Sequence, residues 1–382
     1  MKIFIASDSF KGSLTSKEVA ESLKTGLLEK DSQLQVDYSE IADGGEGSLS
    51  AILSSRTDYE IQSLFVCDLL GHDHKAKYLL GEEEGKKTAI IESSDLLGLH
   101  LVDATSETVE QASSYGLGLA LLELKKKGIE KVVVFLGGTG CSDGGIGLLQ
   151  ALGVDFLTED KRYLDMRSNL LSHNIVDIQN LKKVLEDFST LDIIIGTDVT
   201  NPYTGEEGAQ KVFGKQKGAT PQQIIDFDTQ MIKLNELLKK QVNIDLNIYK
   251  GSGAAGGLGG ILTLLGGDIH SGFDIISNFI GLSDKIADAD LVITGEGSLD
   301  AQSANGKVPM KIATLAKKYA IPTLSISGRR DEYLGELEDT FLSSFSIQRE
   351  VAPLELAISK EYSKSNLKIL GKNIAGMLSL RK

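Results

Sequence analysis

The stretch DLVITGEGSLD (residues 290–300) decides the fold of this sequence, because it repeats a pattern with which the chain also begins. At the start, the apolar run KIFIAS (residues 2–7) leads into the loop DSFKGS (residues 8–13), and a helical pattern follows. In both places a short apolar segment, typical of a buried strand, ends at a loop with carboxylates, and an amphipathic helix comes next. Strands that alternate with helices in this way predict a parallel sheet.

Strands of this kind come from both ends of the chain. Thr15 and Glu18 have the spacing of a capping box at the start of the first helix. We expect an α/β fold with two α/β domains. A doubly wound parallel-sheet domain, flavodoxin-like or Rossmann-like, would comprise residues 1–56 and 286–382, and a second, mixed α/β domain of residues 57–285 would interrupt it. The five predicted strands of the split sheet are KIFIAS, QVDYSEIA (35–42), DLVIT (290–294), PTLSIS (322–327) and TFLSSFSI (340–347).

The inserted segment has a different pattern. Residues 59–93 are rich in strand-forming residues and turn signals, which predicts antiparallel strands. One helix is predicted over residues 107–127, where lysines and a glycine mark its end. The apolar runs KVVVFLGG (131–138) and LDIIIGTD (191–198) predict two buried strands.

Composition limits the class of protein. The 382 residues carry a net charge of −14 with no basic run longer than KKK at 125–127, which argues against a nucleic-acid partner. No apolar run approaches the roughly 20 residues of a membrane span, and the N-terminus does not have the pattern of a signal peptide. We therefore expect a cytoplasmic protein with small-molecule partners, in which Cys67 and Cys141 are buried, reduced thiols.

Charged loops follow the strands of the predicted split sheet. Ligands bind outside the carboxyl ends of parallel strands, so these loops are expected to converge on one site. Like charges that converge in this way cost free energy unless a cation or a metal ion lies between them. The charged residues that the loops supply are Asp8, Lys11, Asp43, Glu46, Glu296, Asp300 and Arg329.

Two loops place an aspartate beside three glycines, ADGGEG (42–47) and SDGGIG (142–147). Glycines let backbone N–H groups approach an anion at a helix N-terminus, and the aspartate can accept a proton or hold a hydrated metal. The alternative is structural, since aspartate is also a favoured helix N-cap. Each of Asp43, Asp143 and Asp198 is open to both interpretations.

Two further segments could bind phosphate. KGSGAAGGLGG (250–260) contains G-x-G-x-x-G at Gly251, Gly253 and Gly256, which suits either a phosphate cradle or tight helix packing. The loop 197–219 carries Lys211, Lys215 and Lys217, which suit phosphate binding or a solvated basic loop. A Walker A motif is absent from the sequence, as are the kinase HRD and DFG motifs.

Six motifs, taken in order, resemble the bacterial glycerate kinase family over essentially the whole chain. The resemblance implies a flavodoxin-like domain interrupted by a restriction-endonuclease-like α/β domain. It also implies transfer of the γ-phosphoryl group of ATP to D-glycerate, with 2-phosphoglycerate favoured over 3-phosphoglycerate. The motifs are DSFKGS (8–13), ADGGEG (42–47), GGTGCSDGGIGLLQALG (137–153), DVTNPYTGEEGAQKVFGKQKGA (198–219), GSGAAGGLGG (251–260) and TGEGSLDAQSANGK (294–307).

The implied reaction assigns roles to these loops, since phosphoryl transfer needs positioning, Mg²⁺ and cations. Lys11 and Arg329 would take anionic oxygens, and Glu296 would hold Mg²⁺. One of three aspartates would orient or deprotonate the hydroxyl. The predicted catalytic residues are Lys11, Asp43, Asp198 and Asp300. The predicted substrate-binding residues are Asp8, Ser9, Lys11, Glu46, Glu296 and Arg329. The residues predicted to bind the ATP phosphates are Gly137, Gly138, Asp143, Gly144, Gly145, Lys215, Gly251, Gly253 and Gly256.

One departure from the family pattern concerns the substrate. The family has Thr-Asn where this chain has Cys141-Ser142, which bears on substrate identity more than on the reaction.

Two other classes of function remain open. A nicotinamide-dependent hydroxy-acid dehydrogenase would use the G-x-G-x-x-G at 251–256 with Asp274 on the ribose, and a non-catalytic protein would only bind the sugar acid.

Overall fold

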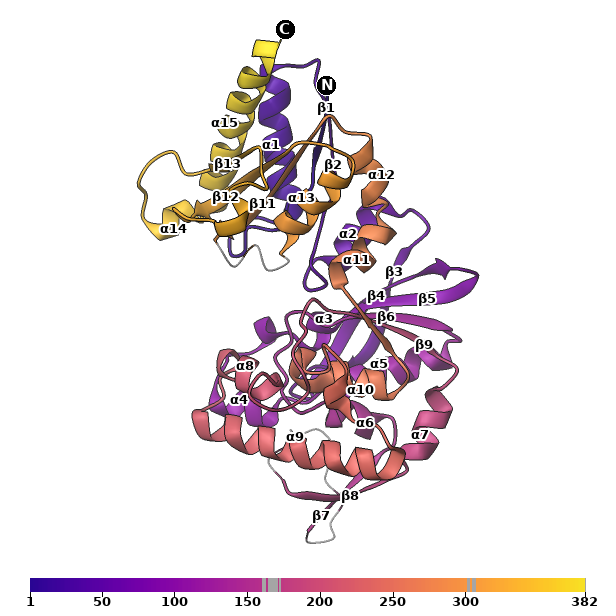
Figure 1. Cartoon of the computed structure of the whole chain (residues 1–382). Helices are drawn as coiled ribbons and strands as arrows, with labels where there is room; N and C mark the ends of the chain where they lie inside the picture. The colour runs from indigo at the N-terminus through magenta and orange to yellow at the C-terminus, as the bar shows by residue number, and fades with distance from the viewer. Residues whose placement is uncertain (160–162, 164–170, 172, 301–302, 304–306, 382) are drawn as a thin grey trace. The chain divides into compact units, whose positions relative to one another are not determined.

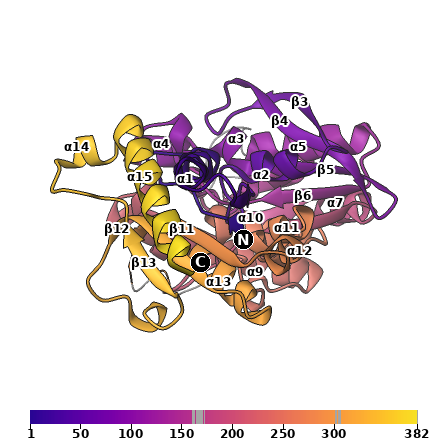
Figure 2. The ribbon, with the colours of Figure 1, turned by 90° about the horizontal axis from the view of Figure 1, so that it is seen from above.

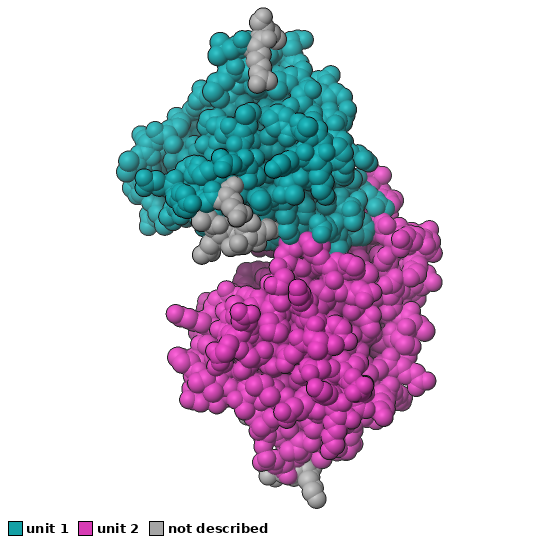
Figure 3. All heavy atoms as spheres, viewed as in Figure 1, with its two compact units in different colours: residues 1–43, 50–56, 273–382 teal, residues 44–49, 57–272 magenta. Residues whose placement is uncertain are grey.

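The computed structural model describes the chain except residues 160–162, 164–170, 172, 301–302, 304–306 and 382 (Figure 1). The chain forms two compact units, drawn in different colours in Figure 3. Unit 1 consists of Met1–Asp43, Ser50–Arg56 and Phe273–Lys382. Unit 2 consists of Gly44–Leu49 and Thr57–Gly272.

Unit 1 is built on a five-stranded parallel sheet with the order β13-β12-β11-β1-β2. Strands from the two ends of the chain lie side by side, since Ile3 pairs with Leu291 and Ile5 with Ile293. Counted within the unit, the order is 2-1-3-4-5, which is the flavodoxin-like order. This confirms the predicted fold class. The strands are β1 (Lys2–Ile5), β2 (Gln35–Tyr38), β11 (Leu291–Leu299), β12 (Thr323–Arg330) and β13 (Ser343–Ser346).

Helices cover both faces of this sheet. The connection β1–α1–β2 and the connection β11–α13–β12 run in opposite directions along the sheet. Since such crossovers are right-handed, α1 and α13 lie on opposite faces. The helices of unit 1 are α1 (Ser16–Lys30), α2 (Ser48–Ser55, shared with unit 2), α11 (Gly272–Phe279), α12 (Leu282–Ala287), α13 (Val308–Lys318), α14 (Leu354–Ala357) and α15 (Lys360–Leu378).

Local sequence determines how α1 begins and packs. The capping box predicted at its start is confirmed, because Glu18 N–H donates to Thr15 Oγ1 (3.2 Å) and Thr15 N–H to Glu18 Oε2 (3.0 Å). Helix α1 lies beside α15 (Figures 1 and 2), and the two backbones approach at Gly26 and Gly371. A side chain at Gly371 would place its Cβ 2.5 Å from Leu23 O, so this close crossing requires glycine.

Unit 2 contains a six-stranded mixed sheet with the order β10-β9-β6-β5-β4-β3. The antiparallel strands predicted within 59–93 are confirmed as β3 to β5, while β5, β6, β9 and β10 are parallel. A separate hairpin joins β7 and β8. The strands are β3 (Glu60–Cys67), β4 (Asp73–Glu83), β5 (Lys86–Glu92), β6 (Lys131–Phe135), β7 (Asp155–Thr158), β8 (Ile175–Gln179), β9 (Asp192–Gly196) and β10 (Asp268–His270).

The prediction of one helix over 107–127 is wrong. The chain forms two helices there and breaks at Ser113 and Ser114, because both hydroxyls donate to Asp143. No helix in the described part of the chain is long and apolar enough to cross a membrane. The α-helices of unit 2 are α3 (Ser93–Leu97), α4 (Ser106–Gln111), α5 (Tyr115–Lys126), α6 (Ile146–Ala151), α7 (Leu181–Phe188), α8 (Ala209–Phe213), α9 (Pro221–Val242) and α10 (Leu258–Leu264).

Candidate active site

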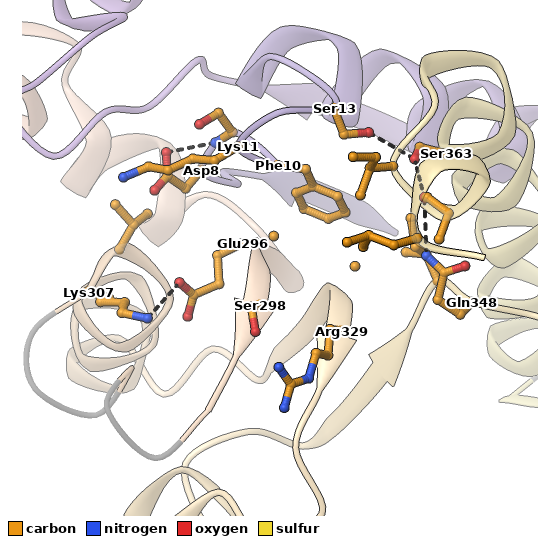
Figure 4. Close-up of a pocket in the computed structure, with 18 of the residues that line it drawn as sticks. Asp8, Phe10, Lys11, Ser13, Glu296, Ser298, Lys307, Arg329, Gln348 and Ser363 are labelled. Atoms are coloured by element: carbon orange, nitrogen blue, oxygen red, sulfur yellow. Dashed lines mark hydrogen bonds and ion pairs between the residues drawn. The ribbon is translucent and has the colours of Figure 1, made fainter. Parts of the chain in front are cut away.

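A pocket lies at the carboxyl edge of the unit 1 sheet. The chain leaves β1 toward β2 and leaves β11 toward β12, so the loops after these two neighbouring strands diverge and leave a crevice between them. The pocket has a volume of about 590 Å³. Its walls come from the loop after β1, from the ends of β11 and β12, and from the segment between β13 and α15 (Figure 4).

Charged side chains of both signs line this pocket. The structure brings together six of the residues predicted from sequence, and it adds Lys307. Three carboxylates and three cations therefore face one space, in a protein whose net charge is −14. Such a local gathering of cations is what an acidic protein needs in order to bind an anionic ligand. The six predicted residues in the pocket are Asp8, Ser9, Lys11, Asp43, Glu296 and Arg329.

Asp8 is held directly after β1 and is largely withdrawn from water. Its Oδ1 accepts a hydrogen bond from Ser9 N–H at 2.7 Å. Burial, helped by the nearby charge of Asp43, raises the pKa of Asp8 to about 6 against the opposing effects of the Ser9 hydrogen bond and the Lys11 charge. A carboxyl group of this kind changes charge close to neutral pH, as acid–base groups in active sites do.

Substitution of Asp8 by asparagine is expected to stabilise the protein at high pH only. The folded-state pKa of about 6 lies above the ordinary value of 3.8 for an aspartate, so the folded protein is penalised for ionising Asp8 as the pH rises through 6. Removing the charge should raise the free energy of unfolding at pH 8 by about 2 kcal/mol. The gain should disappear below pH ~4, where Asp8 is protonated in both states.

Urea unfolding at pH 4, 6 and 8 measures this gain, with Asp339→Asn, an exposed aspartate of the same unit, as the control. A gain that persists at pH 4 would contradict the assigned cause.

Glu296 lies inside strand β11 and is buried, with 7% of its surface exposed. Its Oε2 lies 3.4 Å from Lys307 Nζ, which also lies 3.7 Å from Asp300 Oδ1. The other oxygen, Oε1, is buried without a hydrogen-bond partner among the described residues. Burial raises the pKa of the Glu296 carboxyl. A carboxylate oxygen left in this state is a ready acceptor for a cation or for water bound to one.

Lys307 lines the pocket although it is not among the residues predicted from sequence. It precedes α13 directly and closes the loop that follows β11. The signal that could have identified it is position: like Glu296 and Asp300, it belongs to the connection that leaves the carboxyl end of β11.

The donor set fits a hydrated magnesium ion better than a fully protein-bound metal. Within the described ranges, no three His, Cys, Asp or Glu side chains form a group that could hold a metal. Mg²⁺ keeps several waters and usually takes one or two carboxylates plus phosphate oxygens. The unpartnered Oε1 of Glu296 matches that requirement.

Three predicted residues lie outside the pocket lining. Asp300 accepts from Ser303 N–H at 3.1 Å and faces Lys307. Glu46 and Asp198 belong to unit 2 and are exposed. Asp198 follows β9 and accepts from the Ser271 hydroxyl at 2.8 Å.

The first Asp-Gly-Gly loop does not use its aspartate as a cap. Helix α2 begins at Ser48, and the N–H of Leu49 donates to Glu92 Oε1 at 2.7 Å. Glu92 stands at the end of β5, and burial raises its pKa to about 7. Glu92 therefore serves the N-terminus of this helix, and Asp43 lines the pocket. Local sequence pattern could not predict this hydrogen bond, since 43 residues separate donor and acceptor.

The second loop uses its aspartate structurally. Asp143 has no exposed surface, and its oxygens accept hydrogen bonds at 2.7–3.4 Å that hold the starts of α5 and α6. All of its acceptor positions face protein, so the predicted contact of Asp143 with ATP is not supported. The donors are the N–H groups of Ser114, Gly145 and Gly147 and the hydroxyls of Ser113 and Ser114.

The predicted phosphate-binding glycines serve packing in the same way. A Cβ at Gly256 would lie 2.5 Å from Cys141 O, and one at Gly145 would lie 2.6 Å from Ile261 Cγ1. At Gly253 a Cβ would meet Pro202 O. Protein atoms lie where a side chain would begin at each of these glycines, which gives a packing reason for glycine there, while their contact with ATP stays a prediction; the glycines are Gly144, Gly145, Gly251, Gly253 and Gly256.

The structure does not support the alternative of a nicotinamide-dependent dehydrogenase, because its glycine motif does not follow a strand. A dinucleotide fingerprint must follow a strand, but the segment before Gly251 is a 3₁₀ helix, Leu246–Ile248.

The lysines of loop 197–219 differ from one another in exposure. Lys215 is exposed, as is Gly138 beside the half-buried Gly137. Lys217 is buried and donates to Cys141 O at 2.6 Å, and burial lowers its pKa.

Comparison with known proteins agrees with this architecture. The model of the Glycerate kinase family matches residues 3–379. The glycerate 2-kinase of Escherichia coli K12 is 34% identical over 383 residues, covering 100% of this chain and 98% of its own. The glycerate kinase of Haemophilus influenzae Rd is 34% identical over 386 residues, covering 100% of both chains.

A solved structure is similar over the same length. The crystal structure of a putative glycerate kinase 2 from Salmonella typhimurium LT2 superposes with a TM-score of 0.81 at 33% identity, covering 100% of this chain and 98% of that one. The chain therefore belongs to the glycerate kinase family, whose enzymes phosphorylate a hydroxyl group.

Proposed function

We propose that this protein phosphorylates D-glycerate with Mg²⁺-ATP and yields 2-phosphoglycerate in preference to 3-phosphoglycerate. The observation that carries the proposal is the pocket of unit 1, where three carboxylates and three cations meet at the carboxyl ends of β1, β11 and β12. We propose that the partners of this site are small molecules, namely glycerate and ATP. We also propose that the enzyme works in the cytoplasm. The product preference follows from the relative named as a glycerate 2-kinase.

Cations of the pocket would neutralise the two anionic substrates. Lys11 lies in the loop after β1 and Arg329 near the end of β12, and both are exposed residues of the pocket lining. One can hold the glycerate carboxylate while the other takes phosphate oxygens, because arginine and lysine both stabilise charge that spreads over transferring phosphoryl oxygens. Lys307, placed beside Glu296, would take a further phosphate oxygen.

Glu296 would hold Mg²⁺ through its free Oε1, directly or through water. The bound ion would neutralise charge on the phosphates, and this is the chemistry it supplies. The carboxyl is buried inside a strand, so its position is fixed by the sheet rather than by a loop. That rigidity suits a group that must fix the phosphates relative to the attacking hydroxyl.

Asp8 and Asp43 would act together on the attacking hydroxyl. The charge of Asp43 contributes to the raised pKa of Asp8, so the two carboxylates lie close enough to influence one another. We assign the contact with the hydroxyl to Asp43, which is the more exposed of the two. Asp8, with its pKa of about 6, can then hold the released proton near neutral pH.

Phosphorus NMR tests the proposal directly. Purified protein with Mg²⁺-ATP and D-glycerate should consume the γ-phosphate and give a phosphomonoester signal, and its splitting distinguishes the 2-phosphate from the 3-phosphate. Omission of Mg²⁺ should abolish the signal. Reaction of tartronate semialdehyde or glycerol in place of glycerate would overturn the substrate assignment, and Cys141-Ser142 would then be the first place to look for the cause.

A further inference from the structure

The pocket of unit 1 has two chemically different ends. Figure 4 shows Lys307 and Glu296 on one side and Ser13, Ser363 and Gln348 on the other, with the ring of Phe10 between them. The volume of about 590 Å³ is that of a site for a drug-sized ligand, far larger than a three-carbon acid requires. The charged end would bind the glycerate and the phosphates. The other end is therefore available for a different part of a ligand.

The second end has apolar walls. Phe10 and Ile347 are 3% and 2% exposed and form its inner side. Leu354 and Ile358 belong to the α14 segment and are 73% and 42% exposed, although both line the pocket. Apolar side chains that face solvent along the rim of a pocket are typical of a ligand-binding surface.

Polar atoms are present at one edge of this apolar space. The hydroxyls of Ser13 and Ser363 lie 2.9 Å apart, and either can donate. Gln348 Nε2 donates to Ala357 O at 3.4 Å, which fixes the orientation of the carboxamide. Its Oε1 is buried and has no hydrogen-bond partner among the described residues. A lone acceptor at the edge of an apolar slot calls for a ligand with an N–H group there.

We infer that this end of the pocket binds the adenine base of the nucleotide. A purine is flat and apolar on both faces, which suits Phe10 on one side and Ile358 on the other. Its exocyclic amine would donate to Gln348 Oε1. The ribose and phosphates would then extend toward Lys11 and Lys307 at the charged end. This inference rests on the proposed use of ATP.

The position in the fold supports a nucleotide. The pocket lies where the strand order reverses, between β1 and β11, and doubly wound sheets bind nucleotides at that point. The glycines at 144–145 and 251–256 have a packing reason of their own, since a Cβ on any of them would meet protein atoms. A peptide or a lipid would leave the cationic end without a counter-charge.

Calorimetric titration with ADP and IDP, without glycerate, tests the inference apart from catalysis. IDP has a carbonyl oxygen where ADP has the amine, so the wild type should bind ADP at least tenfold more tightly. Gln348→Leu should bind the two alike. Ile358→Asn should weaken ADP binding about tenfold while leaving inorganic tripolyphosphate binding unchanged. Leu356→Asn, on the same helix and 46% exposed but outside the pocket lining, is the matched control and should bind ADP as the wild type does.

Two outcomes would overturn the inference: ADP binding that is unaffected by Ile358→Asn, or an ADP preference that survives in Gln348→Leu. Failure of the proposed function looks different, because ADP would bind and respond to these variants while glycerate remained unphosphorylated. Phosphorylation of glycerate by ATP together with unchanged ADP binding in both variants would leave the function standing and remove the adenine site.

Discussion

Replacing Asp43 with asparagine is expected to lower the turnover of glycerate about a thousandfold, the middle of the range for loss of a general base. The free energy of unfolding should change by less than about 0.5 kcal/mol, as for a surface substitution. Asp43 is exposed and lines the pocket beside Asp8. In the helix that follows, the N–H of Leu49 donates to Glu92, so this bond at the helix N-terminus does not depend on the Asp43 charge.

Turnover at saturating glycerate and ATP, together with urea unfolding of the same preparations, measures both effects. Asp300→Asn is the matched control, because Asp300 is a carboxylate at the same sheet edge that does not line the pocket. Its turnover should fall much less. An Asp43→Asn enzyme that keeps its turnover but loses stability would make Asp43 a structural residue and return the base to one of the other carboxylates.

The pH profile supplies a second readout from the same variant. Asp43 contributes to the raised pKa of Asp8, so its neutralisation should lower that pKa. The loss of activity on the acid side, expected near pH 6 in the wild type, should therefore move to lower pH in Asp43→Asn. If Asp43 acted independently of Asp8, Asp43→Asn would lower the rate but would leave the acid side of the pH profile where it is in the wild type.

The sequence was sufficient for the parts of the fold that depend on local pattern. Apolar runs separated by amphipathic helices predicted the five strands that pair as β13-β12-β11-β1-β2. From there, the rule that ligands bind at the carboxyl ends of parallel strands brought Asp8, Asp43 and Glu296 to one edge. For these residues it was enough to know where each strand ends along the chain, which the hydrophobic pattern indicates.

Roles that depend on distant partners could not be predicted in this way. A glycine that lets a ligand approach and a glycine that lets another backbone approach look the same in sequence. Gly256 meets Cys141 and Gly253 meets Pro202, and each contact spans about 50 residues or more. Likewise, whether an aspartate caps its own helix depends on a competitor such as Glu92, which arrives from another strand.

The matching aspartate of the second loop is expected to behave in the opposite way from Asp43. Asp143→Ala should lower the free energy of unfolding by about 4 kcal/mol, as when one partner of a buried charged network is removed. The buried donors of Ser113, Ser114, Gly145 and Gly147 would lose their acceptor. The buried ammonium of Lys217, which Asp143 also stabilises, would lose a compensating charge.

Urea unfolding of Asp143→Ala beside Asp43→Ala makes the comparison within one sequence motif. The first variant should unfold at much lower urea and, below its transition, should turn over glycerate at near the wild-type rate, because Asp143 has no surface to offer a substrate. The second should unfold like the wild type and be inactive. If Asp143→Ala instead kept its stability and lost affinity for ATP, its carboxylate would have to reach the nucleotide, and the packing role of the second loop would be wrong. The same five letters, Asp-Gly-Gly-x-Gly, therefore predict an active-site group where the carboxylate is left exposed and a structural anchor where five donors enclose it.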